Sequence, residues 1–135
     1  MGKSKTYQLD HAHFEHRLWR NELDLVAQEA TFFLKILEEY EKKTSNLPNN
    51  LVMIGEFANQ FHHYQRLTKR LLEELTVIEK EVSQGVLDDN VLDTEQKKDH
   101  QYLKEEMKYF ESDYRETKRK FRDFIASYEF TVASN

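Results

Sequence analysis

Apolar residues recur at helical spacing through three long stretches of this chain, and two short polar breaks separate the stretches. The first break is 44–50, where Pro48 and several turn-forming residues interrupt the pattern. The second is 83–85, where Gly85 suits the left-handed position that follows a helix end. Because three Gly and one Pro among 135 residues leave few other places for turns, the sequence predicts three long helices.

The expected helices span about 8–43, 50–83 and 89–128 of a single domain, 1–135. The third stretch has two apolar rows whose members follow one another at seven-residue steps, as in coiled coils. These rows are His100, Met107, Tyr114, Phe121 and Tyr128, and Leu103, Phe110, Thr117 and Phe124. Since short connections place consecutive helices antiparallel, we expect an all-α, coiled-coil-like, up-down-up bundle.

The first helix carries a row of glutamates, Glu15, Glu22 and Glu29, at the same seven-residue spacing. Two apolar rows flank it: Leu18, Leu25, Phe32 and Ile36, and Trp19, Val26, Phe33, Leu37 and Tyr40. Helical geometry therefore points Glu22 and Glu29 near the middle of an apolar face. Hairpin geometry places Glu22 in one layer with the region of His100, so we expect Glu22 and His100 to form a buried charged pair.

The same layer permits an alternative, a metal-binding bundle of hemerythrin-like or di-iron type. It would hold iron, manganese or zinc through Glu22, His100, Glu15 and His16. His11 and Glu15 form one H-x-x-x-E motif of the hemerythrin-like kind, but the paired Glu-x-x-His motifs of di-iron bundles are absent from the sequence. The first expectation is therefore a bundle without a metal or another cofactor.

Composition excludes several classes of function. A net charge of −5 argues against general nucleic-acid binding. The absence of cysteine excludes disulfides and cysteine nucleophiles and suits a reducing compartment. No run approaches the ~18 apolar residues of a membrane span, and Met1 to Asp10 lack the apolar core of a signal peptide. We therefore expect a cytoplasmic protein without a membrane partner.

No complete set of catalytic residues is present, so we expect no enzymatic activity and no small-molecule substrate. Long amphipathic helices favour a protein that acts through protein–protein contacts. A narrow bundle leaves its flanks exposed, which favours a homodimer. Tyr102 and Tyr109, beside the apolar rows of the third helix, are candidate oligomer contacts.

Short motifs at 16–23 (HRLWRNEL), 56–61 (EFANQF), 99–100 (DH) and 110–111 (FE) resemble an uncharacterised family of small all-helical bacterial proteins. The resemblance spans most of the chain. It implies a helical fold and a bacterial cytoplasmic origin, and it implies no particular activity.

Overall fold

Three helices make up nearly all of the described chain: α1 (Gly2–Lys43), α2 (Pro48–Asp88) and α3 (Thr94–Ser134). The computed structural model describes the backbone of residues 2–44, 47–88 and 94–134, and the side chains of residues 10–44, 47–83 and 95–128. Every secondary-structure element within these ranges is a helix. The predicted all-α three-helix bundle is confirmed.

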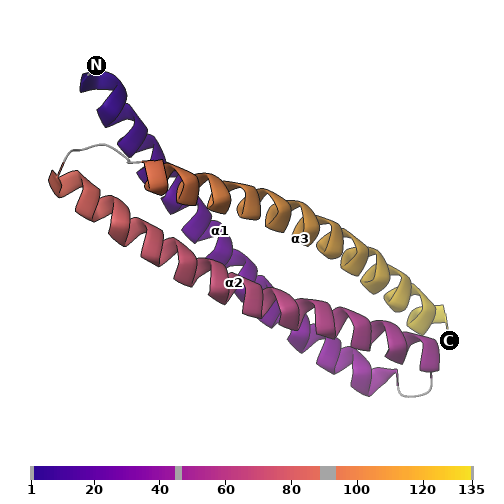
Figure 1. Cartoon of the computed structure of the whole chain (residues 1–135). Helices are drawn as coiled ribbons and strands as arrows, with labels where there is room; N and C mark the ends of the chain where they lie inside the picture. The colour runs from indigo at the N-terminus through magenta and orange to yellow at the C-terminus, as the bar shows by residue number, and fades with distance from the viewer. Residues whose placement is uncertain (1, 45–46, 89–93, 135) are drawn as a thin grey trace.

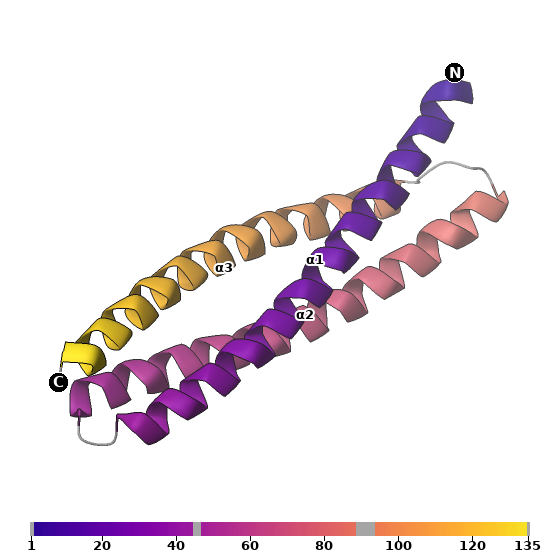
Figure 2. The same cartoon turned by 180° about the vertical axis from the view of Figure 1, so that it is seen from behind.

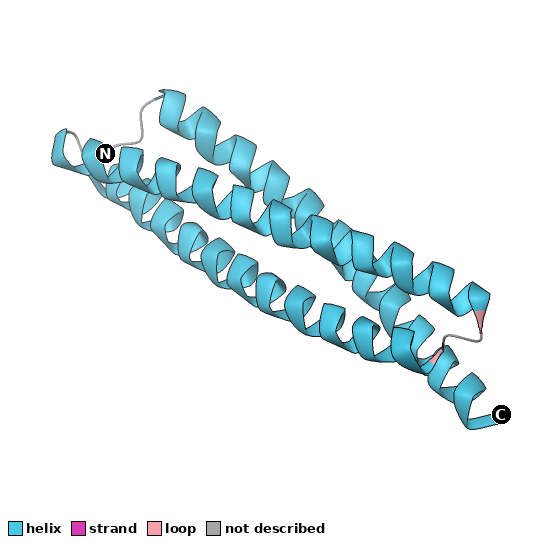
Figure 3. Cartoon of the chain, turned by 90° about the horizontal axis from the view of Figure 1, so that it is seen from below, coloured by secondary structure: helices cyan, strands magenta, loops and turns pink. Residues whose placement is uncertain are grey.

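The helices run up, down and up along a rod (Figure 1). The carboxyl end of α3 lies beside the start of α2, and the first turns of α1 project beyond the other two helices (Figures 1 and 2). A third view shows the same three helices along the length of the rod (Figure 3). The backbone of α2 approaches both of its neighbours, whereas the backbones of α1 and α3 lie farther apart. Long side chains therefore join α1 to α3.

Thr44 and Pro48 define the first connection. The backbone N–H of Leu47 donates a hydrogen bond of 2.9 Å to the Thr44 carbonyl oxygen. The Asn50 amide donates to the Thr44 hydroxyl oxygen at 3.3 Å. Pro48 is the first residue of α2, where a missing backbone N–H leaves no helical hydrogen bond unmade. The first helix ends at Lys43 as predicted, and α2 begins at Pro48, two residues before the predicted start at 50, because proline is well suited to the first turn of a helix.

The second connection lies farther along the chain than predicted. α2 continues past Gly85 to Asp88, and α3 begins at Thr94 rather than near residue 89. Glycine inside a helix costs only about 1 kcal/mol relative to alanine, so Gly85 alone does not end a long helix. α1 and α3 also extend beyond the predicted limits of 8 and 128, since α1 begins at Gly2 and α3 ends at Ser134.

An aromatic cluster forms the core near the α1–α2 connection. The ring centroids of Phe33 and Phe121 are 4.9 Å apart, and those of Phe61 and Phe121 are 5.0 Å apart. Phe57 meets Phe121 edge-on at 5.5 Å. Towards the other end, α2 contributes aliphatic residues to the core, with Leu71 and Leu75 fully buried. All three helices thus share one continuous core.

The two apolar rows of α1 differ in burial. Trp19, Val26 and Leu37 of the second row are buried in the core. Leu18, Leu25 and Phe32 of the first row face solvent, and Phe14 joins them one helical turn earlier. These four side chains remain 50% to 59% exposed. We call Phe14, Leu18, Leu25 and Phe32 the α1 stripe.

Candidate functional site

The glutamate row of α1 faces α3, where each glutamate meets a different set of partners. Glu15 contacts His100, Glu22 contacts Glu111, and Glu29 contacts Tyr114 and Lys118. All three glutamates are partly buried, because the row lies between the core residues of α1 and the α1 stripe. The row is therefore a polar seam that joins α1 to α3 across their wide backbone separation. We call it the glutamate seam, and we call each glutamate with its partners a station of the seam.

The first station of the seam is a carboxylate surrounded by histidines. His100 Nε2 lies 3.3 Å from Glu15 Oε1, and His11 Nε2 lies 2.8 Å from the same oxygen. His100 Nδ1 lies 3.0 Å from His16 Nε2. If the carboxylate accepts the Nε2–H of His100, then His100 Nδ1 accepts the Nε2–H of His16. The arrangement is a chain of hydrogen bonds from His16 through His100 to Glu15.

Burial keeps His16 neutral. Its side chain is almost wholly enclosed, and its ring packs against Trp19 and His100 with centroid separations of 5.5 and 5.0 Å. Desolvation, followed by repulsion from His100, lowers the pKa of His16 from 6.5 to about 4. Its buried Nδ1 finds no hydrogen-bond partner among the described residues. His16 therefore acts near neutral pH as an uncharged core residue.

The second station is a pair of carboxyl groups. Glu22 of α1 and Glu111 of α3 lie close enough across the interface for their carboxyl groups to interact, which is favourable only with a proton on one of them. Burial, assisted by this interaction and by repulsion from Glu111, raises the pKa of Glu22 to about 7, while Arg115 lowers it. Glu22 therefore gains or loses its proton close to neutral pH.

The third station is fully paired. The Tyr114 hydroxyl donates to Glu29 Oε1 at 2.8 Å, and Lys118 Nζ donates to Glu29 Oε2 at 2.7 Å. Burial, the bond to Glu29 and the negative charge of Glu29 raise the pKa of Tyr114. The hydroxyl stays protonated and holds the carboxylate. This station joins α1 to α3 through both carboxyl oxygens of Glu29.

The predicted Glu22–His100 pair is wrong. Both ring nitrogens of His100 are engaged by His16 and Glu15, while Glu22 lies against Glu111. Bonded positions of α1 and α3 differ by 84 to 89 residues, whereas Glu22 and His100 differ by 78. The cause is the second connection, since extension of α2 to Asp88 moves α3 along the bundle. The partner of His100 on the glutamate row is thus Glu15, seven residues before Glu22.

The residues named for the metal alternative are only partly brought together. Glu15, His16 and His100 form one cluster, and Glu22 belongs to the next station. Within the described side chains, no group of three or more His, Asp or Glu residues is placed to hold a metal ion.

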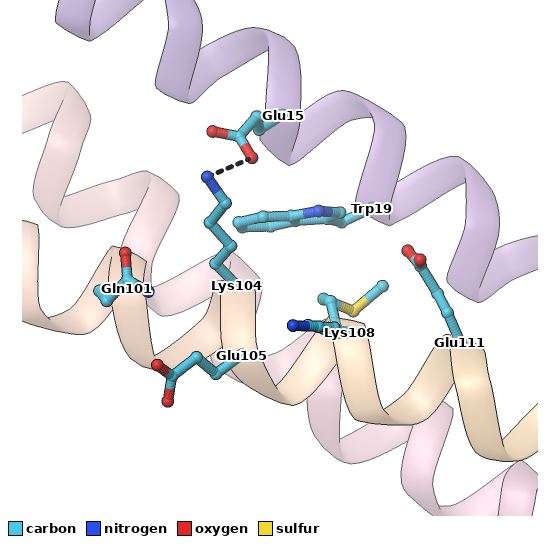
Figure 4. A pocket seen from close by; sticks show the side chains of 8 residues that line it. Glu15, Trp19, Gln101, Lys104, Glu105, Lys108 and Glu111 are labelled. Carbon is cyan, nitrogen blue, oxygen red and sulfur yellow. Dashed lines mark ion pairs between the residues drawn. The ribbon is translucent and has the colours of Figure 1, made fainter.

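A cavity of about 380 Å³ opens beside the first two stations, between α1 and α3. Trp19 forms one wall, and Lys104 and Lys108 of α3 lie opposite it (Figure 4). Lys104 Nζ is 3.9 Å from Glu15 Oε2, as the dashed line shows. The remaining lining residues are Gln101, Glu105, Met107 and Glu111. The sequence did not predict Trp19 and Glu111 as residues of this cavity: Trp19 was assigned only to an apolar row of the first helix, and the place of Glu111 depends on the register between α1 and α3.

The two tyrosines predicted as oligomer contacts are exposed on the other side of α3. Tyr102 lines a second cavity, of about 400 Å³, between α2 and α3. The other lining residues are Glu73, Glu74, Val77, Ile78, Glu81 and Asp99. Tyr109 is more exposed than Tyr102 and does not line this cavity. We call this cavity the acidic groove.

Comparison of the chain with protein-family models, with curated proteins and with solved structures gives no match. The resemblance to a family of small helical bacterial proteins stays a prediction. In the described ranges, no helix combines the length and the apolar character that a membrane crossing requires.

Proposed function

We propose that this protein is a non-enzymatic helical bundle that acts through protein–protein contacts, with a second copy of itself as the partner. The α1 stripe is the observation that carries the proposal. Phe14, Leu18, Leu25 and Phe32 lie along one side of α1 and leave half or more of each side chain in water. An apolar row at heptad spacing is the pattern by which one helix packs on another.

The size of the stripe sets the strength of association that we expect. Full burial of one such side chain is worth about 1.5–3 kcal/mol. Covering the exposed half of four of them is therefore worth about 3–6 kcal/mol. Association itself costs about 4–15 kcal/mol in lost freedom of motion, so the stripe alone supports only a weak, concentration-dependent dimer. Tighter binding needs further contacts.

The glutamate seam supports a structural role rather than a catalytic one. Its groups are bonded to one another, and His16 is neutral and enclosed. A catalytic base needs a free lone pair directed at a substrate proton, whereas Glu15 and Glu29 are engaged with neighbouring side chains. We infer a cytoplasmic location from the lack of cysteine.

Light scattering over a wide concentration range tests the proposal. The wild-type mass should rise above 16.3 kDa as the concentration increases. Leu25→Arg should remain monomeric, because it places a charge in the centre of the stripe. Val52→Arg is the matched control, since Val52 is 59% exposed on α2 and lies outside the stripe. Self-association through α1 is refuted if the wild type stays at 16.3 kDa or if Leu25→Arg associates as the wild type does.

A further inference from the structure

The amino-terminal segment of α1 packs into the core through a histidine. Between residues 10 and 18, the buried side chains are those of Ala12 and His16. The next core positions along α1 are all apolar: Trp19, Leu23, Val26 and Ala30. Because alanine buries only a methyl group, His16 is the one large side chain by which this segment enters the core. The packing of residues 10–18 therefore depends on a side chain that can take up a proton.

The hydrogen bond between His16 and His100 limits the charge that the two rings can carry. His16 Nε2 and His100 Nδ1 lie 3.0 Å apart, so one of these nitrogens donates and the other accepts. With an additional proton on both rings, both nitrogens would be donors and two cations would face each other. The closed packing therefore holds only while the two rings together carry at most one positive charge.

The titratable groups around this station come from all three helices: His11, His13, Glu15 and Arg20 of α1, Glu79 of α2, and His100 and Lys104 of α3. Desolvation of the His16 ring, followed by repulsion from His100 and His13, lowers its pKa to about 4. Glu15 opposes this effect, but its carboxylate is also contacted by His11 and Lys104. The neutral form of His16 is therefore favoured above its ordinary pKa of 6.5, and this preference is lost as the pH falls towards 4.

The contacts that follow this segment along α1 do not weaken over the same pH range. Arg20 donates a hydrogen bond of 2.9 Å to Glu79 Oε2, which fastens α1 to α2. At the second station, protonation of Glu22 below about pH 7 removes its repulsion from Glu111. Moderate acid therefore weakens the first station while it strengthens the second. An acid-induced opening should be confined to the part of α1 before Arg20.

We propose that residues 10–18 of α1 form a pH-dependent latch, which packs against α3 while His16 is neutral and detaches from α3 when His16 takes up a proton. The latch continues directly from the first turns of α1, which project beyond the other two helices (Figure 1). Its release uncovers Trp19, whose ring packs against those of His16 and His100 at 5.5 and 5.2 Å. This inference goes beyond the proposed function and does not depend on self-association.

Hydrogen exchange measured by mass spectrometry, at about 10 μM protein, tests the latch. In the detached segment His16 has its ordinary pKa of 6.5, so a fall from about pH 7 to about pH 5 should increase the open population about tenfold or more. After correction for the intrinsic exchange rate, the protection of the amides in residues 10–18 should fall by this factor. Residues 23–37 of the same helix should keep their protection.

A variant and a control identify the group responsible. His16→Leu places an apolar side chain at the core position and should make the protection of residues 10–18 independent of pH. His63→Leu is the matched control, because His63 is exposed on α2, and it should keep the wild-type pH dependence.

Fluorescence quenching provides a second measurement, on the wild type alone. Trp19 is the only tryptophan of the chain and is 7% exposed. The Stern–Volmer constant for quenching by acrylamide should rise as the pH falls over the same range. Because acrylamide is uncharged, a change in the charge of the protein does not by itself alter this constant.

Three results would overturn the latch. If the protection of residues 10–18 and the quenching of Trp19 do not change with pH, the segment stays closed. If residues 23–37 lose protection as residues 10–18 do, the chain unfolds as a whole. If His16→Leu keeps the wild-type pH dependence, another group is responsible. None of these results decides self-association, which light scattering tests separately.

Discussion

Replacing Glu22 with glutamine should remove a pH dependence from the stability of the bundle. The folded state raises the pKa of Glu22 from 4.5 to about 7, through burial and the interaction with Glu111. A raised carboxyl pKa means that the folded state holds its proton more tightly than the unfolded state. The stabilisation is therefore fully present below pH 4.5 and is lost as the pH rises through about 7.

The magnitude follows from the size of the shift. Each pKa unit corresponds to about 1.4 kcal/mol, which gives a ceiling of about 3 kcal/mol. Glu22 keeps part of its side chain in solvent, and screening there reduces the effect to about 1–2 kcal/mol. For a chain of this size, 1 kcal/mol corresponds to about 4 °C in Tm. The wild-type Tm should therefore fall by about 4–8 °C relative to that of Glu22→Gln between about pH 5 and pH 8.

The assay compares thermal unfolding of the two proteins by circular dichroism across this range. Taking the difference cancels the contribution of His16, which both proteins contain and which titrates in the same range. Glu38→Gln is the matched control, because Glu38 is an exposed glutamate on α1 and its replacement should leave the wild-type slope unchanged. The reasoning is refuted if Glu22→Gln shows the same slope as the wild type.

Three further predictions concern the other stations of the glutamate seam. Tyr114→Phe should lower the free energy of unfolding, measured in urea, by about 1.5–3 kcal/mol, because it removes the 2.8 Å bond to Glu29. Tyr109→Phe should change this free energy little because Tyr109 is exposed, and equal effects of the two variants would contradict the role of Tyr114. Protonation of His16 should destabilise the wild type as the pH falls from 6.5 towards 4, because the folded state lowers the pKa of His16 and holds its neutral form. His16→Leu should lose this contribution to the fall in Tm, and a fall as steep as that of the wild type would contradict the assignment. Untagged protein loaded with zinc and then dialysed should retain no stoichiometric metal, because both nitrogens of His100 are already engaged; one bound zinc per chain by elemental analysis would reverse this conclusion.

The heptad pattern was sufficient to predict the helices because apolar spacing and scarce turn residues act within short stretches of chain. The break at Pro48 is an example, since proline at that place permits only the start of a helix. Gly85 was a weaker signal, because glycine raises the free energy of a helix only slightly and tertiary packing overrides it. The end of α2 therefore depended on contacts that local sequence does not contain.

The register between α1 and α3 could not be predicted for the same reason. Glu22 was expected at the level of His100, and the actual partner of His100 on the row, Glu15, lies two turns away. The spacing correctly showed that the glutamates point towards a neighbouring helix, but the second connection determined which residue each one meets. Sequence also could not tell which apolar row of α1 would be buried, because Leu25 and Val26 are equally suited to a core. The positions of α2 and α3 decide between them.

The most direct test of the central claim is whether the α1 stripe becomes covered when the protein is concentrated. Because the chain contains no cysteine, a spin label attached through Asn21→Cys would report on the exposed surface between Leu18 and Leu25 alone. A label attached through Glu56→Cys, at an exposed position on α2, is the control. Between about 10 μM and about 1 mM, the electron paramagnetic resonance spectrum should broaden for the label at position 21 and stay unchanged for the label at position 56. Identical spectra at both concentrations for position 21 would contradict a contact through α1.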